Sequence, residues 1–159
     1  MLRDDADFFS TRYDDMVREP EQTWREWVAG AAAGTEKTLF VADEDDRWLG
    51  VVGAFARIDP LEVQLISMWV DPSARGRGVA RDLIRAVACW TADRGSTRVV
   101  LFVQEANTPA RHLYERAGFR LTGDRAPAAG GRSAFKLVLA ASTTDLLPPP
   151  DGASAARSQ

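Results

Sequence analysis

The chain has 159 residues, of which 45% are apolar, so it can bury one substantial core but is too short for two ordinary domains. Its net charge of -3 argues against a general binder of nucleic acid or anionic membranes, because such partners require a sustained positive field. With one cysteine and one histidine, the sequence has no internal disulfide framework and no Cys/His metal cluster. It also shows neither a signal-peptide pattern nor a membrane-length apolar run. We therefore expect a cytoplasmic protein whose chemistry needs no metal.

Two short helices and then three strands open the predicted fold. Aromatic residues among charged ones predict helices over residues 2–17 and 21–33, broken near Pro20. Three apolar runs separated by turn-rich segments then predict antiparallel strands, over residues 37–43, 47–56 and 62–70.

The middle of the chain predicts a crossover between two parallel strands. Apolar residues at 79, 80, 83, 84, 87 and 88 form a helical stripe that begins at Val79 and ends near Gly95. The uninterrupted apolar run over residues 98–103 is typical of a strand covered on both faces. We expect it to pair in parallel with the strand that ends at Val70, with the helix as a right-handed crossover.

A second helix and a pair of strands close the predicted domain. Asn107 is a good N-cap for this helix, and Gly118 is suited to end it. Residues 119–123 and 133–140 read as the closing strands, so we expect an α/β (α+β) domain over residues 1–140. Residues 141–159 contain three consecutive prolines and no aromatic residue, and predict a mostly disordered tail.

The segment Arg75-Gly76-Arg77-Gly78 lies between a strand and the Val79 helix, where it can bind an anion. The first turn of a helix has free backbone N–H groups, and glycines let a ligand approach them closely. Two arginines add positive charge, which suits a group such as a pyrophosphate. The alternative is a glycine-rich turn with solvated arginines.

Two motifs resemble those of the GNAT superfamily of N-acyltransferases. Residues 70–80, V-D-P-x-x-R-G-x-G-x-A, are similar to its acyl-CoA signature R/Q-x-x-G-x-G/A. Residues 107–119 are similar to its second segment, N-x-x-A-x-x-L-Y-x-x-x-G-F. The motifs occur in the family's order, and the resemblance extends over about residues 4–140. It implies a mixed central sheet flanked by helices, with antiparallel N-terminal strands and a parallel pair splayed at the CoA site.

The resemblance also implies which residues would bind acetyl-CoA. These are Met68, Trp69, Val70, Arg75, Gly76, Arg77, Gly78, Val79, Ala80, Asn107 and Tyr114. The 75–80 loop would hold the pyrophosphate, and the end of the strand at residues 68–70 would pair with the pantetheine arm. The Met68 amide would polarise the thioester carbonyl, and the Tyr114 hydroxyl would assist the leaving thiolate. The alternative for Tyr114 is a core residue packed by Leu113 and Phe119.

The general base is less clearly indicated. Glu62 lies on the strand that leads to the CoA site, and Glu105 follows the parallel strand, so either could accept the amine proton directly or through water. Both could equally be solvated carboxylates at strand ends. His112 is expected to be exposed and Cys89 to be buried or half-buried in its helix, and neither is assigned a role.

The leading hypothesis is an N-acetyltransferase that transfers acetyl from acetyl-CoA to a primary amine by direct attack in a ternary complex. The acceptor would be a small molecule, or the N-terminus or a lysine of a protein or peptide. Trp24, Trp27 and Trp48 could line its pocket or lie in the core. The alternative is a non-catalytic acyl-CoA-binding or regulatory domain.

The start of the chain leaves no room for the strand that normally opens this fold. Residues 6–11 resemble the end of the family's first helix, so either the chain starts downstream of its natural beginning or the domain lacks that strand. In the second case the strand at 37–43 becomes an edge, which would lower stability or form a homodimer interface.

Overall fold

The computed structural model describes residues 22, 29–32, 34–127 and 135–148. The first predicted helix, over 2–17, lies outside these residues. Of the second, Gln22 and residues 29–32 are described and are helical. Trp24 and Trp27 are not described, so their placement in the core or in a pocket stays a prediction.

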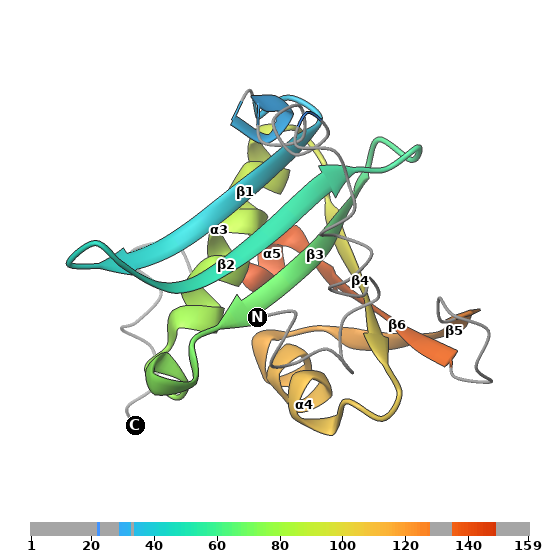
Figure 1. The fold of residues 1–159 in the computed structure, drawn as a ribbon. Coiled ribbons are helices and arrows are strands. Elements are labelled where there is room, and N and C mark those ends of the chain that lie inside the picture. The colour runs from blue at the N-terminus through green and yellow to red at the C-terminus, as the bar shows by residue number, and fades with distance from the viewer. Residues whose placement is uncertain (1–21, 23–28, 33, 128–134, 149–159) are drawn as a thin grey trace, which may run out of the picture.

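A six-stranded mixed sheet forms the centre of the molecule (Figure 1). Among the described residues the strands lie in the order β1-β2-β3-β4-β6-β5, and only β3 and β4 pair in parallel. Their bounds are β1 Lys37–Glu44, β2 Arg47–Ala56, β3 Glu62–Val70, β4 Arg98–Gln104, β5 Arg120–Pro127 and β6 Phe135–Ser142. All six predicted strands are thus present, and β1 is at one edge of the described sheet.

Helix α3, Val79–Asp93, crosses from β3 to β4 and buries the predicted apolar stripe. Leu83, Ile84 and Val87 lie in one hydrophobic core with the inward-facing residues of the strands. Their removal from water is the main stabilising contribution of this helix. Gly95 follows the helix with a φ of +76°, the left-handed conformation expected of a helix stop.

Helix α4, Thr108–Ala117, begins and ends where the sequence indicated. The Asn107 side chain accepts a hydrogen bond from the Ala110 N–H at 3.1 Å, which caps the first turn. Gly118 ends the helix at a φ of +115°. The fully buried Phe119 follows, and β5 begins at the next residue.

The folded chain continues beyond residue 140, where the sequence placed the end of the domain. Strand β6 extends to Ser142, and a short helix α5, Thr143–Leu146, follows it. Leu146 is only 5% exposed and belongs to the core, so burial offsets the low hydrophobicity of this segment. Residues 149–159 lie outside the described residues.

Two side-chain placements were also resolved by the structure. Cys89 is exposed, contrary to expectation, because it lies beside rather than on the apolar stripe of α3. Trp48 is 63% exposed near the β1–β2 turn, so it is not a core residue.

Candidate functional site

The parallel strands β3 and β4 form a gap that opens toward their C-terminal ends. They are paired over only three residue pairs, Glu62 with Arg98, Val63 with Val99 and Gln64 with Val100. Beyond these pairs the two strands diverge (Figure 1). A backbone segment without a ladder partner retains N–H and C=O groups that can bind an extended ligand.

A bulge in β3 lies at this gap. The pairing of β3 with β2 shifts between Val51 and Gly53, opposite Ser67, whose φ is +53°. A non-glycine residue in the left-handed region is uncommon, so the pairing of the strands, rather than the preference of the serine itself, sets this conformation. After the bulge, Met68 and Val70 pack against the core, so the strand end is held in place. No sequence pattern indicates this bulge.

The predicted anion loop joins the end of β3 to α3. A 3-10 turn, η2 Pro72–Ala74, precedes Gly76 and Gly78, which have φ values of +78° and +94°. A Cβ atom at either glycine would meet nothing within 4 Å, so the space above the loop is open. Among the described residues, the N–H groups of Gly76, Gly78, Val79 and Ala80 donate no hydrogen bond. These donors fit a pyrophosphate group.

The two arginines of the loop are each engaged by a protein group. Arg75 donates from Nε to the Val70 carbonyl at 3.1 Å, so it folds back onto the end of β3. Arg77 forms an ion pair with Glu44 of β1, with 2.7 Å between Nη2 and Oε1. The open backbone donors are thus the groups of the loop that a ligand could reach without displacing a protein partner.

Asp71 organises the entrance to the loop, a role that the sequence reading missed. Its carboxylate accepts hydrogen bonds from the Ser73 N–H at 2.9 Å and from the Ser73 hydroxyl, and it pairs with Arg47 at 3.1 Å. The Ser73 bonds are the main cause of a lowered pKa of Asp71, and Arg47 lowers it further. The sequence Asp-Pro-Ser is a turn signal that could have indicated this cap.

Tyr114 lies in the core cluster against which Met68 packs. It is 7% exposed, and its ring meets Phe119 edge to face with 5.7 Å between centroids. Burial raises the pKa of Tyr114 above its ordinary value, so the phenol stays protonated at neutral pH. Its hydroxyl makes no hydrogen bond within the described part of the chain. The contact with Phe119 predicted for a core tyrosine is present, and the free hydroxyl leaves a proton-donor role open.

Asn107 lies between β4 and α4, beside the open end of the gap. Its side-chain oxygen is used by the helix cap, so its amide NH₂ group is the part that could contact a ligand. The structure therefore brings together the end of β3, the 75–80 loop and Asn107 around one gap.

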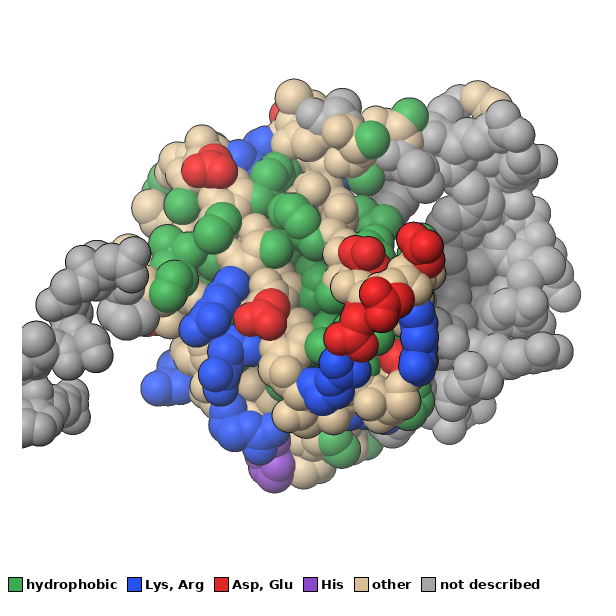
Figure 2. Space-filling view, turned by 90° about the vertical axis from the view of Figure 1, so that its left-hand side faces the viewer, with side chains coloured by type: hydrophobic (Ala, Val, Ile, Leu, Met, Phe, Trp, Pro, Cys, Tyr) green, Lys and Arg blue, Asp and Glu red, His purple; other side chains and the backbone are tan. Residues whose placement is uncertain are grey.

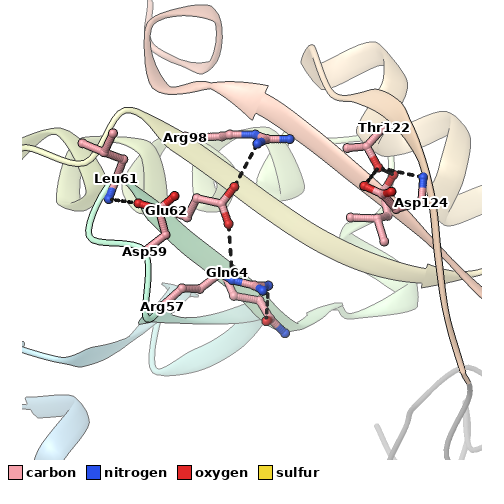
Figure 3. A network of polar contacts seen from close by, with 9 residues as sticks. Arg57, Asp59, Leu61, Glu62, Gln64, Arg98, Thr122 and Asp124 are labelled. Atoms are coloured by element: carbon pink, nitrogen blue, oxygen red, sulfur yellow. Dashed lines mark hydrogen bonds and ion pairs between the residues drawn. The ribbon is translucent and has the colours of Figure 1, made fainter.

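Glu62 is not brought to this site. It is the first residue of β3, at the paired end, and about 20 Å from Met68 by the rise of a strand. Its carboxylate pairs with Arg57 at 3.4 Å and with Arg98 at 2.9 Å, and its side chain is 16% exposed (Figure 3). Arg57 also donates to Gln64 at 3.2 Å. These contacts join β3 to the end of β2 and the start of β4, where the parallel pair is closed.

Glu105 lies at the opposite end of the parallel pair from Glu62. It follows the last residue of β4, on the side where the gap is open. Its side chain is 50% exposed and lies 3.4 Å from Arg125. Of the two carboxylates considered as general base, Glu105 is the one that the fold places near the loop-bearing end of the gap.

Neither a catalytic histidine nor a metal site is found elsewhere in the part of the chain that the structure describes. His112 is exposed, as predicted. No group of three His, Cys, Asp or Glu side chains in the described ranges could hold a metal ion. Within those ranges, too, no helix has the length and apolar character required to cross a membrane.

Comparison with known proteins identifies the class. Residues 2–119 match the family described as Acetyltransferase (GNAT) family. The chain belongs to this family, which confirms the resemblance and the mixed α/β fold expected from it.

Individual relatives of the chain also carry the names of acetyltransferases. N-acetyltransferase 8B of Homo sapiens is 35% identical over 89 residues, covering 54% of this chain and 39% of the relative. Mycothiol acetyltransferase of Thermomonospora curvata is 42% identical over 82 residues, covering 51% of this chain and 27% of the relative. The chain thus matches less than half the length of these curated relatives. An aminoglycoside 6'-N-acetyltransferase solved with coenzyme A superimposes with a TM-score of 0.63 at 18% identity, covering 82% of this chain and 88% of that one.

Proposed function

We propose that this domain is an acetyl-CoA-dependent N-acetyltransferase that transfers the acetyl group directly to a primary amine. The observation that carries the proposal is the splayed β3–β4 pair with an open, donor-rich loop at its wide end. The named relatives are acetyltransferases, one of them an N-acetyltransferase by name, and one structural neighbour is complexed with coenzyme A, which supports acyl-CoA as the co-substrate.

The backbone of the loop would hold the co-substrate. The N–H groups of Gly76, Gly78, Val79 and Ala80 would donate to the pyrophosphate, reinforced by the positive end of the α3 dipole. Trp69 and Val70 would pair with the pantetheine arm as an added strand does, and Asn107 would contact it from across the gap. Acetyl-CoA supplies an acyl group activated as a thioester.

Three groups would then assist transfer. The Met68 N–H would donate to the thioester carbonyl as negative charge develops on its oxygen. Glu105 would accept the proton that the amine must lose, directly or through water. Tyr114, kept protonated by burial, would give a proton to the leaving sulfur. Holding both reactants at one gap would supply much of the rate through proximity.

The acceptor is a primary amine of a small molecule or of a protein or peptide. The test combines titration calorimetry with acetyl-CoA and an assay of thiol release against a panel of small amines and peptides. Binding together with amine-dependent thiol release is expected. Saturable binding without release on any amine would instead support a regulatory acyl-CoA-binding domain, and absence of binding would refute both.

A further inference from the structure

Arg77, in the middle of the anion loop, is held by a carboxylate from a distant part of the chain. Glu44 is the last residue of β1, and its Oε1 lies 2.7 Å from Nη2 of Arg77. The side chains are 53% and 49% exposed, so water and solutes reach both partners. An Arg fork binds carboxylate and phosphate with the same geometry, and a guanidinium engaged by one is less available to the other.

The β1–β2 hairpin that carries Glu44 is fixed against the loop at a second point. Arg47, which opens β2, pairs with Asp71 at 3.1 Å and also donates to the Ser73 hydroxyl, just before the anion loop. The hairpin is strongly acidic, with four consecutive carboxylates at residues 43–46. Figure 2, which views the side toward which this hairpin projects, shows acidic side chains gathered beside basic ones.

We propose that Glu44 competes with the phosphates of CoA for Arg77 and so sets the affinity of the loop for its co-substrate. The inference rests on the proposed function of the loop. Bound phosphate and the Glu44 carboxylate are both anionic, so they repel each other across the same arginine. Binding therefore requires Arg77 to leave Glu44 or to be shared with it, and the lost ion pair lowers the observed affinity.

The test measures CoA affinity by titration calorimetry for wild type, Glu44→Gln and Asp46→Asn. Asp46 is a matched control, since it is on the same hairpin and the same charge is removed, yet it forms no ion pair among the described residues. Asparagine also tolerates the φ of +62° at this position. We expect Glu44→Gln to increase the affinity for CoA by about two- to fivefold, which corresponds to the free energy that an exposed ion pair contributes. Asp46→Asn should give a clearly smaller gain.

Two further measurements separate local competition from general charge. The gain from Glu44→Gln should shrink in about 1 M salt, where the Debye length is about 3 Å. It should also disappear when Arg77→Gln is the background, because the arginine for which the groups compete is then absent.

Several outcomes would overturn the inference. Wild-type or weaker affinity in a folded Glu44→Gln variant would do so, as would an equal gain from Asp46→Asn or a gain that persists in the Arg77→Gln background. Failure of the wild-type protein to bind CoA would instead overturn the proposed function, and the inference with it.

Discussion

Substitution of Gly78 by glutamate tests the anion loop most directly. Gly78 is the N-cap of α3, it is exposed, and a Cβ built on it meets nothing within 4 Å. The new side chain therefore enters open space next to the free N–H groups of Val79 and Ala80, where the pyrophosphate is proposed to bind.

The cost to stability comes from the backbone. Gly78 has a φ of +94°, and a left-handed conformation costs a non-glycine residue roughly 1–2 kcal/mol. For a chain of this size, each 1 kcal/mol lowers Tm by about 2–4 °C. The expected loss of about 2–8 °C leaves the protein folded at the temperature of a binding assay.

The cost to binding comes from charge. A carboxylate about 4 Å from one phosphate charge is repelled by about 1 kcal/mol in water and about 4 kcal/mol near a protein surface. This range corresponds to a loss of CoA affinity between about fivefold and a thousandfold.

Gly95→Glu is the matched control. Gly95 also has a positive φ, +76°, and open space around its Cβ position, but it follows the other end of α3. Gly95 is 17 residues after Gly78, which at the rise of a helix is a distance of about 25 Å. This distance exceeds the Debye length of about 10 Å at 0.1 M salt, so a charge at residue 95 is screened from the loop. A glutamate there also opposes the helix dipole, whereas one at residue 78 favours it.

The control should thus be at least as destabilised, yet bind CoA as wild type does. The assay is titration calorimetry with CoA, together with thermal unfolding of all three proteins. Wild-type affinity in folded Gly78→Glu would refute the pyrophosphate assignment, and an equal affinity loss in both variants would trace the effect to instability.

Three further outcomes are expected. Tyr114→Phe should lower kcat by about 10²-fold or more with little change in KM for acetyl-CoA, and an unchanged kcat would leave Tyr114 as a packing residue only. Glu105→Gln should lower kcat/KM without loss of stability, whereas Glu62→Gln should lower Tm with kcat/KM retained, and the reverse pattern would reassign the base. Because burial raises the pKa of Tyr114 above its ordinary value of 10.0, the folded state retains a proton that the unfolded state loses, so stability should fall as pH rises above about 10. Unfolding midpoints of wild type and Tyr114→Phe that change equally with pH between 9 and 11 would contradict this.

The parts of the fold that the sequence predicted best are those with local signals. The stripe from Val79 onward, the Asn107 cap and the Gly118 stop each act within a few residues, and α3 and α4 begin and end there. The short helix α5, which includes Leu146, was missed, because its burial depends on a core assembled from distant strands. Short stretches rich in polar residues and proline carry no local sign of such a contact.

The bulge at Ser67 shows the same limit at the site. Glycine usually marks a position that needs a positive φ, but serine occupies this one, so the sequence offers no pattern to read. The conformation arises from the register between β3 and β2, a property of two strands together. Gly50, opposite Val70, is a related case, because a Cβ there would lie 2.9 Å from the Trp69 carbonyl oxygen. This close approach becomes visible only once the sheet is assembled.

Side-chain partners alter the roles that motifs suggest. The sequence predicts Arg75 and Arg77 as phosphate ligands. In the structure, however, Arg75 donates to the Val70 carbonyl and Arg77 pairs with Glu44. The glycines, in contrast, leave their N–H groups open, and backbone donors need no rearrangement before they meet an anion. In the proposed complex, recognition of phosphate at this loop would therefore be carried first by the backbone. The arginines would adjust its strength, since each must exchange a partner that the fold already provides.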